Sequence, residues 1–347
     1  MSRMANFWAA DGLDVTIITL DELANDFYPL DRRVRRVALD LAAVSATPIT
    51  AVINNLVRLW RLRAEILRHD PHVVISFMDY MNVLTLLATL GLPVSVIVSE
   101  RNDPRFHFLG DIWSRLRSRL YRRAKALVVQ STAVKQWAQV IAPPALVHVI
   151  PNPVSAAAGC DDHEAVPIAG PFVVAMARLV HQKGLDLLIE AFARCTQTRG
   201  EWSLVIIGEG EERERLSEHA ARLGLTGRVL MPGRLQAPAT VLRKASLFVL
   251  SSRHEGFPNA LLEAMCCGLP VISFDCPSGP AEIIHDGVDG VLVPPENVAA
   301  LANAMGRLMD DERERQYLGE QATRVVERFS LDKVMSQWEQ VIDQAMN

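Results

Sequence analysis

The sequence has little of what stabilises small secreted proteins or builds metal centres. It contains 5 cysteines in 347 residues, with no C-x-x-C pair and no histidine at a zinc-binding spacing, so neither a disulfide framework nor a zinc site is expected. No basic segment followed by an apolar run opens the chain, so we expect no signal peptide and a cytoplasmic location. The apolar, uncharged run 83–99 is broken by Gly91 and Pro93, which favours a buried helix followed by a strand over a membrane span.

Positive charge is concentrated in the first half, although the whole chain has a net charge of −4. Residues 1–154 hold 18 Lys and Arg against 13 Asp and Glu, whereas the remainder holds 18 against 27. The basic residues form three clusters: Arg32, Arg33, Arg35 and Arg36; Arg58, Arg61, Arg63 and Arg68; and Arg115, Arg117, Arg119, Arg122, Arg123 and Lys125. With Trp60, Trp113 and Tyr121 beside them, they predict contact with an anionic membrane surface, the alternative being solvated helix faces. Net charge and low aromatic content disfavour nucleic acid as a partner.

Apolar runs and helical patterns alternate along the chain and predict two successive α/β units. The expected strands of the first unit are 15–20, 72–77, 94–99, 126–131 and 147–152, and those of the second are 172–177, 204–208, 228–232, 247–251, 270–274 and 290–294. Between them, 154–170 is small and polar without an apolar period, which indicates a linker. We therefore predict two Rossmann-like doubly wound domains, 1–153 and 171–330, facing across a cleft. The closing helix within 331–347 is expected to cross back to the first domain.

The first domain departs from this plan at its start. A doubly wound unit opens with a strand, but residues 1–12 have a helical pattern instead. In the usual strand order the opening strand is central, so its absence predicts two neighbouring strands with unpaired backbone groups. The loop that would follow the strand is also missing, which predicts impaired activity.

Two cations follow the first strand of the second unit. Arg178 and Lys183 stand in R-L-V-H-Q-K-G-L-D, at a strand end where ligands of open parallel sheets bind. Their charges can neutralise a diphosphate. Gly184 is expected to open a helix, and the backbone amides there and at Gly256 and Phe257 can add donors to the same anion.

Two carboxylates, Glu255 and Glu263, stand eight positions apart in R-H-E-G-F-P-N-A-L-L-E-A-M-C-C-G-L-P. Because carboxylates repel phosphate, they are expected to accept hydrogen bonds from the hydroxyls of a ribose and a hexose. The alternative for either one is a solvated acid at a helix end.

These segments together resemble the retaining GT-B glycosyltransferases of family four. The matching blocks are V-I-P-N-P-V, A-R-L-V-H-Q-K-G-L-D-L-L-I-E-A-F, L-V-I-I-G-E-G-E-E-R-E-R-L, S-S-R-H-E-G-F-P-N-A-L-L-E-A-M-C-C-G-L-P-V-I and G-P-A-E-I-I-H-D-G-V-D-G, in that order. The resemblance implies catalytic roles for Arg178, Lys183 and Glu255. It implies donor binding by Glu263, Gly256, Phe257, Pro258, Asn259 and Gly233. It also implies that no metal or other cofactor is needed.

On the first domain, polar residues at two strand ends are candidates for the acceptor side. Asp79 and Asn82 stand where many relatives have a histidine, and they can bind hydroxyls or cap a helix. Glu100 and Arg101 belong to S-E-R-N-D-P, which occurs in some relatives that extend lipid-linked glycans. The alternative for this second couple is a structural ion pair.

The resemblance implies transfer of a hexosyl group from a nucleotide sugar, with UDP as the expected nucleotide, and retention of anomeric configuration. The expected acceptor is a glycan or an undecaprenyl-diphosphate-linked glycan at the inner face of a bacterial plasma membrane. Two alternatives stay open: a catalytically silent partner subunit that binds nucleotide, and a sugar-nucleotide epimerase that consumes donor without acceptor.

Overall fold

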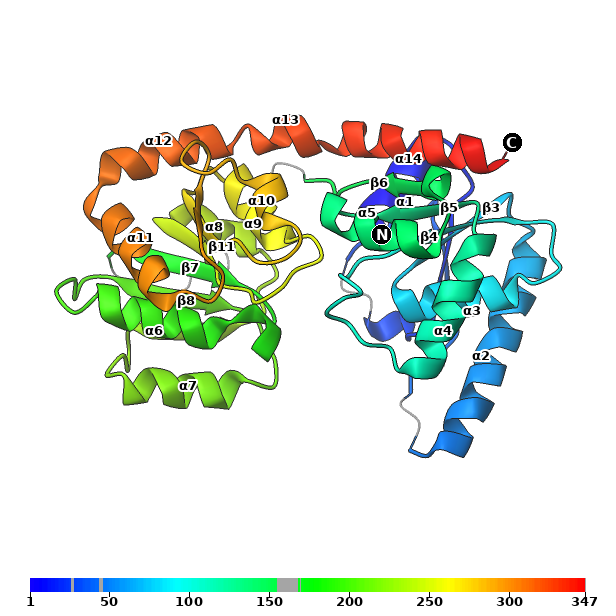
Figure 1. Cartoon of the computed structure of the whole chain (residues 1–347), viewed down its shortest axis with the longest axis horizontal. Coiled ribbons are helices and arrows are strands. Elements are labelled where there is room, and N and C mark those ends of the chain that lie inside the picture. The colour runs from blue at the N-terminus through cyan, green and yellow to red at the C-terminus, as the bar shows by residue number, and fades with distance from the viewer. Residues whose placement is uncertain (26–27, 44–45, 155–167, 169, 347) are drawn as a thin grey trace.

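The computed structural model describes residues 1–25, 28–43, 46–154, 168 and 170–346. The chain forms two α/β lobes, and its last helices run along one side of both (Figure 1). Among the helices in these ranges, none is both long and apolar enough to cross a bilayer.

The first domain begins with a helix, as the sequence predicts. Its helices are α1 (Ser2–Ala10), α2 (Pro48–His69), α3 (Asp79–Ala88), α4 (Asp111–Leu120) and α5 (Thr132–Ile141), with short 3-10 turns at Leu23–Asn25, Tyr121–Arg123 and Pro144–Leu146. Its strands are β1 (Thr16–Thr19), β2 (Arg35–Ala38), β3 (Val73–Phe77), β4 (Ser95–Ser99), β5 (Ala126–Val129) and β6 (Val147–Val149).

These strands form two parallel sheets, with orders β1-β2 and β3-β4-β5-β6. Within the described residues no strand joins β1 to β3. The two strands nevertheless share hydrophobic clusters. Ile18 of β1 and Val74 of β3 pack against the cluster around Leu62. Val15, directly before β1, and Ile75 of β3 pack against the cluster around Trp338. The split agrees with the predicted lack of a central strand.

The second domain contains the complete doubly wound sheet. Its strands are β7 (Phe172–Met176), β8 (Ser203–Ile207), β9 (Val229–Gly233), β10 (Leu247–Leu250), β11 (Val271–Phe274) and β12 (Val291–Val293). Its helices are α6 (Leu185–Cys195), α7 (Arg213–Arg222), α8 (Pro238–Lys244), α9 (Asn259–Cys266), α10 (Pro280–Ile283), α11 (Val298–Asp310), α12 (Glu312–Ala322) and α13 (Val325–Phe329), with a 3-10 turn at His181–Lys183. The sheet order is β12-β11-β10-β7-β8-β9, all parallel.

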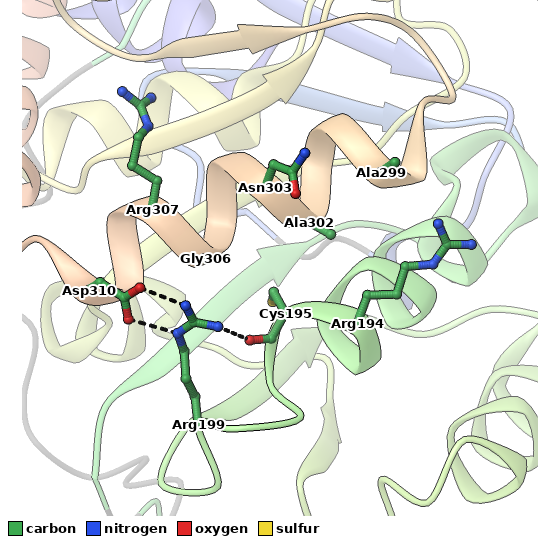
Figure 2. A pocket seen from close by; sticks show the side chains of 9 residues that line it. All are labelled: Arg194, Cys195, Arg199, Ala299, Ala302, Asn303, Gly306, Arg307 and Asp310. Atoms are coloured by element: carbon green, nitrogen blue, oxygen red, sulfur yellow. Dashed lines mark hydrogen bonds and ion pairs between the residues drawn. The ribbon is translucent and has the colours of Figure 1, made fainter.

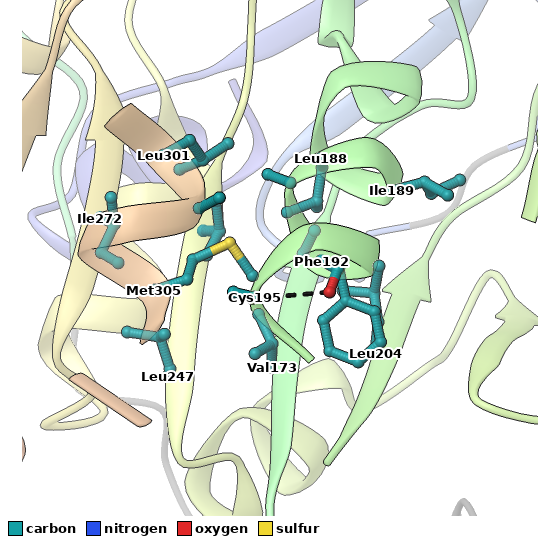
Figure 3. Close-up of a cluster of buried hydrophobic side chains, with 14 of the residues drawn as sticks. Val173, Leu188, Ile189, Phe192, Cys195, Leu204, Leu247, Ile272, Leu301 and Met305 are labelled. Atoms are coloured by element: carbon teal, nitrogen blue, oxygen red, sulfur yellow. Dashed lines mark hydrogen bonds between the residues drawn. The ribbon is translucent and has the colours of Figure 1, made fainter. Parts of the chain in front are cut away.

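The strands of this sheet are nearly continuous apolar runs because both faces are covered by helices. One cluster places Leu188 and Phe192 of α6 and Met305 of α11 against one face (Figure 3). On the other face, Leu261 and Met265 of α9 pack with Phe248 of β10. This packing holds the strand ends rigidly in place.

The last helix, α14 (Leu331–Met346), crosses to the first domain as predicted. Trp338 is fully buried there, with its ring centroid 6.4 Å from that of Trp8 in α1. Ser95 Oγ of β4 donates to Ala345 O at 2.6 Å. The sequence predicts a linker at 154–170, of which 155–167 and 169, with Cys160, lie outside the described residues.

Polar contacts join the two domains at the carboxyl ends of their strands. Glu282 of α10 accepts hydrogen bonds from Thr132 N at the start of α5, at 2.8 and 3.0 Å. Asn152 Nδ2 donates to Asn259 Oδ1 at 2.7 Å. The two sets of strand ends therefore face one another and are in direct contact.

Candidate active site

The loops after β7 and β10 lie side by side because these strands are parallel neighbours, with Phe248 beside Val174. In chain order they are the first and fourth strands of the sheet. The strand order reverses between them, and open α/β sheets bind ligands at such a point. Arg178 and Lys183 follow β7 and Glu255 follows β10, so the fold brings these predicted residues to one place.

Gly184 shows how closely these loops pack. It precedes α6 with φ +57°, and a Cβ at this position would lie 2.1 Å from Ser251 O. Ser251 Oγ donates to Lys183 O at 3.0 Å. Only glycine fits both the backbone angle and the space, and the predicted helix start at Gly184 is confirmed.

Lys183 and Glu255 form an ion pair, with 2.6 Å between Nζ and Oε1. Ser252 Oγ donates to the same oxygen at 2.6 Å. Glu255 is 5% exposed, so its charge is compensated by this ammonium and this hydroxyl rather than by water. The sequence placed both side chains near the ligand but did not predict that they bind each other.

Arg178 is the cation that stays available. Its side chain is exposed, and within the described residues it makes no hydrogen bond or ion pair. It is therefore free to bind an anion without first giving up a protein partner.

Arg253 is a structural residue of the site that the sequence analysis missed. Its guanidinium donates to both carboxylate oxygens of Asp186, at 2.9 and 2.8 Å, and to His181 O at 2.7 Å. This bidentate ion pair, with the bond to His181 O, links the start of α6 and the turn before Lys183 to the segment that carries Glu255. No short-range pattern reveals it, because Arg253 and Asp186 are 67 positions apart.

Glu263 lies on α9, and burial raises the pKa of its carboxyl group, while the charge of Arg3 on α1 lowers it. The Glu263 carboxylate makes no hydrogen bond or ion pair in the described part of the chain. Because Arg3 belongs to the first domain, Glu263 lies within electrostatic reach of that domain across the cleft. Its oxygens remain available to hydroxyl donors of a ligand.

The remaining predicted donor-side residues lie near the start of α9 or at the end of β9. A Cβ on Gly256 would lie 2.4 Å from Arg101 O, so glycine is required for the domains to close. Phe257 is buried against Phe329, with 5.7 Å between ring centroids, and Pro258 and Asn259 begin α9. Gly233 ends β9 with φ +90° and accepts from Gly208 N at 2.9 Å. These positions shape the backbone, and their contact with donor stays a prediction.

On the first domain, Asn82 and Glu100 are buried and do not line the cleft. Tyr121 OH donates to Glu100 Oε1 at 2.6 Å, and Asn82 Nδ2 donates to Tyr121 OH at 3.1 Å. Burial raises the pKa of Glu100 to about 7, although the hydrogen bond from Tyr121 and the charge of Arg117 lower it. In this closed form neither residue is open to an acceptor.

The ion pair between Glu100 and Arg101, the alternative from the sequence, does not form. Glu100 instead faces Arg117, 3.9 Å away. Arg101 Nη1 donates to Asn152 Oδ1 at 2.6 Å, and its guanidinium lies 4.6 Å from the ring centroid of Phe77. Two successive residues of a strand end point to opposite sides, which separates their partners.

The first predicted basic cluster lies partly in a strand. Arg35 and Arg36 lie on β2, a strand that the sequence analysis did not predict. Arg35 pairs with Asp14 at 3.1 Å, and Arg33 with Asp31 at 2.9 Å. Because these ion pairs are largely exposed, they contribute little to stability, and contact of this cluster with a lipid surface stays a prediction.

A cavity of about 350 Å³ lies away from this cleft, between α6 and α11 (Figure 2). Arg199 at its wall donates to both oxygens of Asp310, at 2.7 and 2.6 Å. It contains none of the predicted site residues.

Comparison with known proteins agrees with this geometry. Residues 1–153 match the family model described as "Glycosyl transferase 4-like domain", and residues 162–325 match "Glycosyl transferases group 1". The chain belongs to the GT-B glycosyltransferases. The fold of this glycosyltransferase is similar to sucrose-phosphate synthase from Thermosynechococcus elongatus, with a TM-score of 0.85, 19% identity and coverage of 99% of this chain and 91% of that one. It is also similar to Anabaena HepE in complex with UDP and glucose, with a TM-score of 0.78, 19% identity and coverage of 98% and 94%.

Two curated relatives show the range of sequence similarity for this glycosyltransferase. An exopolysaccharide phosphotransferase of Streptomyces coelicolor is 36% identical over 223 residues, which are 64% of this chain and 24% of that protein. A Campylobacter jejuni α-1,4-N-acetyl-D-galactosaminyltransferase that acts on an undecaprenol-diphosphate glycan is 25% identical over 340 residues, covering 96% and 91%. The chain spans a quarter of the first relative and about half of an uncharacterised Methanocaldococcus jannaschii glycosyltransferase that is 32% identical.

Proposed function

We propose that the chain transfers a hexosyl group from a UDP-sugar to a glycan or lipid-linked glycan, with retention of anomeric configuration and without a metal. The observation that carries this is the meeting of Arg178, Lys183 and Glu255 where the loops after β7 and β10 adjoin. Two cations suit a diphosphate, and carboxylates suit sugar hydroxyls. UDP as the nucleotide is supported by the HepE structures, which contain UDP with glucose or UDP-glucose.

In the proposed reaction, the acceptor oxygen forms a bond to the anomeric carbon while the bond from that carbon to the diphosphate breaks. The departing diphosphate oxygen takes the acceptor's proton on the same face of the sugar, which keeps the configuration. Arg178, Lys183 and the backbone amides near Gly184 stabilise the charge that develops on the leaving group. Glu255 and Glu263 then hold hydroxyls of the sugar and the ribose.

Lys183 must leave Glu255, in part or fully, to reach the diphosphate. A hydroxyl of the bound sugar then takes the place of the ammonium beside Glu255, and the negative charge of the diphosphate takes the place of the carboxylate beside Lys183. The ion pair therefore keeps both groups desolvated and oriented before donor arrives, which favours catalysis by preorganisation.

We also propose an anionic membrane surface as a partner, with α2 as the contact. Ile49, Val52, Ile53, Leu56 and Trp60 are between 53% and 73% exposed. Their spacing of three and four residues places them along one side of this helix, and Arg61 and Arg68 are exposed further along it. An apolar stripe with tryptophan and arginine beside it is typical of helices that lie in a bilayer interface.

The decisive experiment measures nucleotide release from UDP- and GDP-sugars, with and without undecaprenyl-diphosphate glycans, followed by NMR of the product's anomeric configuration. Acceptor-dependent release of UDP with a retained linkage is the expected result. Release without any acceptor would support the epimerase, and nucleotide binding with no release would support the silent partner.

A further inference from the structure

The loop after β4 carries a histidine that the sequence analysis did not single out. His107 Nδ1 lies 2.7 Å from Asp79 Oδ2. Asp79 is 4% exposed, and its other oxygen accepts from Tyr80 N at 2.7 Å. Oδ2 makes no well-directed hydrogen bond in the described part of the chain, so the imidazole is its polar neighbour. Half of the His107 side chain is exposed. The buried carboxylate of Asp79 is therefore in contact with the half-exposed imidazole ring of His107.

The same loop reaches the second domain next to the candidate active site. The ring of Phe106 stacks on His254, with 5.0 Å between centroids and 17° between planes. Asp103 accepts from Ser278 Oγ at 2.5 Å, which fixes the loop from the other domain.

His107 also lies near the segment that carries Glu255. Burial lowers the pKa of His254, and the charge of His107 is among those that act on it. His254 directly precedes Glu255 in the chain. His107 of the first domain therefore lies near the segment of the second domain that is proposed to hold the donor.

Backbone strain is a second, independent observation at this site. Met78, directly before Asp79, has φ +76° and ψ 140°, which is rare for a residue with a side chain. Such a conformation costs about 1–3 kcal/mol and is concentrated at functional sites. The hydrogen bond from Met78 N to Ser99 O, at 3.1 Å, helps to hold it. The strained residue sets the position of Asp79 at the start of α3.

We propose that His107 binds a hydroxyl of the acceptor sugar, next to the hydroxyl that attacks, and that Asp79 is its positioning residue. A carboxylate beside Nδ1 favours the tautomer with the proton on that nitrogen, which leaves Nε2 as a hydrogen-bond acceptor. The attacking hydroxyl keeps its own proton for the diphosphate. This inference rests on the proposed transferase function and assigns the acceptor side of its site.

The choice of acceptor over donor follows from the position of the pair. His107 and Asp79 belong to the first domain, whereas every predicted diphosphate-binding group belongs to the second. Asn82 and Glu100, the other predicted acceptor-side residues near α3 and β4, are buried beneath the surface. His107, in contact with Asp79, is half-exposed, so its ring is accessible where those two side chains are not.

The test compares His107→Ala, His107→Gln and Asp79→Asn in the full chain, with His72→Ala, an exposed histidine before β3, as matched control. The acceptor is the undecaprenyl-diphosphate glycan that gives most release with the unmodified protein. Three quantities are measured: the acceptor KM of transfer, the rate of donor hydrolysis without acceptor, and the Kd of UDP by calorimetry.

We expect His107→Ala to raise the acceptor KM about tenfold, the effect of one lost hydrogen bond, with donor hydrolysis and UDP binding unchanged. His107→Gln should recover part of the loss because its amide oxygen still accepts, and Asp79→Asn should give a smaller rise. An unchanged acceptor KM in His107→Ala would overturn the proposal, as would donor hydrolysis that falls with transfer, since the ring would then contact the transferred sugar. Absence of release by the unmodified protein would instead refute the proposed function itself.

Discussion

Lys183 and Glu255 form an ion pair, with 2.6 Å between the ammonium nitrogen and the nearer carboxylate oxygen. Lys183 is proposed to bind the diphosphate and Glu255 a hydroxyl of the sugar. Each side chain therefore occupies the position that a ligand group would take beside the other. When the donor binds, the ion pair between Lys183 and Glu255 must be replaced by a contact of Lys183 with the diphosphate and a contact of Glu255 with the sugar.

Lys183→Ala is expected to reduce kcat by about 10²–10³, the usual loss when one donor to a developing negative charge is removed. It should also weaken UDP binding and lower the Tm, because Glu255 is left buried without a cation. Steady-state kinetics and thermal unfolding measure both effects. Arg194→Ala, which removes an exposed cation at the far end of α6, should change neither. An increase in KM alone would contradict the proposed role at the leaving group.

Glu263→Gln is expected to make the protein more stable and weaken its binding of UDP. Burial raises the pKa of this carboxyl group in the folded state, so the folded chain binds a proton more tightly than the unfolded chain does. The resulting loss of folding stability is absent below the pKa of the unfolded state. It is fully present once the pH exceeds the raised pKa of the folded state. The neutral amide avoids it at pH 7, while it also loses a charged acceptor for ribose hydroxyls. The Tm from calorimetric unfolding should rise, and the affinity for UDP from titration should fall. A lower Tm would refute this account.

Glu100 should make stability depend on pH between about 4.5 and 7. Its carboxyl pKa rises from 4.5 to about 7 on folding, chiefly through burial. The native state therefore holds a proton that the unfolded state has lost, and the free energy of unfolding falls as pH rises through this window. The loss amounts to about 3 kcal/mol at 1.36 kcal/mol per pKa unit.

The Glu100→Gln variant tests that dependence, since its amide resembles the protonated acid. Denaturant unfolding of the variant should match the unmodified chain near pH 4.5 and exceed it at pH 8. Glu320→Gln, an exposed site on α12, should follow the unmodified chain throughout. Parallel pH profiles for all three proteins would show that Glu100 does not titrate in this range.

The stripe on α2 should govern binding to anionic vesicles. We expect the protein to sediment with vesicles of phosphatidylcholine and phosphatidylglycerol, less with phosphatidylcholine alone, and less at high salt because surface charges are screened. Replacing both Ile53 and Leu56 by Asn should reduce the partition coefficient at least tenfold, since two apolar contacts are lost. Leu223→Asn, at an exposed leucine of the second domain, is the matched control. Equal sedimentation of variant and unmodified protein would exclude α2 as the contact.

The sequence predicted the second domain well because its signals are local. Each buried parallel strand is an apolar run, and glycine at 184 and 256 marks places where a Cβ has no room. Strand β2 was missed because it is only four residues long and begins with two adjacent arginines. The ion pair of Arg35 could not be predicted either, because its partner Asp14 is 21 positions away.

The site was only partly predictable for a related reason. Which residues follow β7 and β10 can be inferred from the chain, but which side chains bind each other depends on packing between distant segments. Lys183 and Glu255 are 72 positions apart, and Asp79 meets His107 only because α3 and the loop after β4 converge. Asn82 and Glu100 stand at suitable strand ends, yet both are buried and hydrogen-bonded to the hydroxyl of Tyr121.

Helix α14 makes the order of synthesis matter for folding. Trp338, Met335 and Val334 supply a large part of the core of the first domain, yet they are translated after the whole second domain. At about 5–20 residues per second, roughly ten to forty seconds separate the end of β6 from the arrival of this helix. During that time the first domain exposes an unfinished apolar surface on the ribosome. The domain that is made first is therefore the one that finishes folding last.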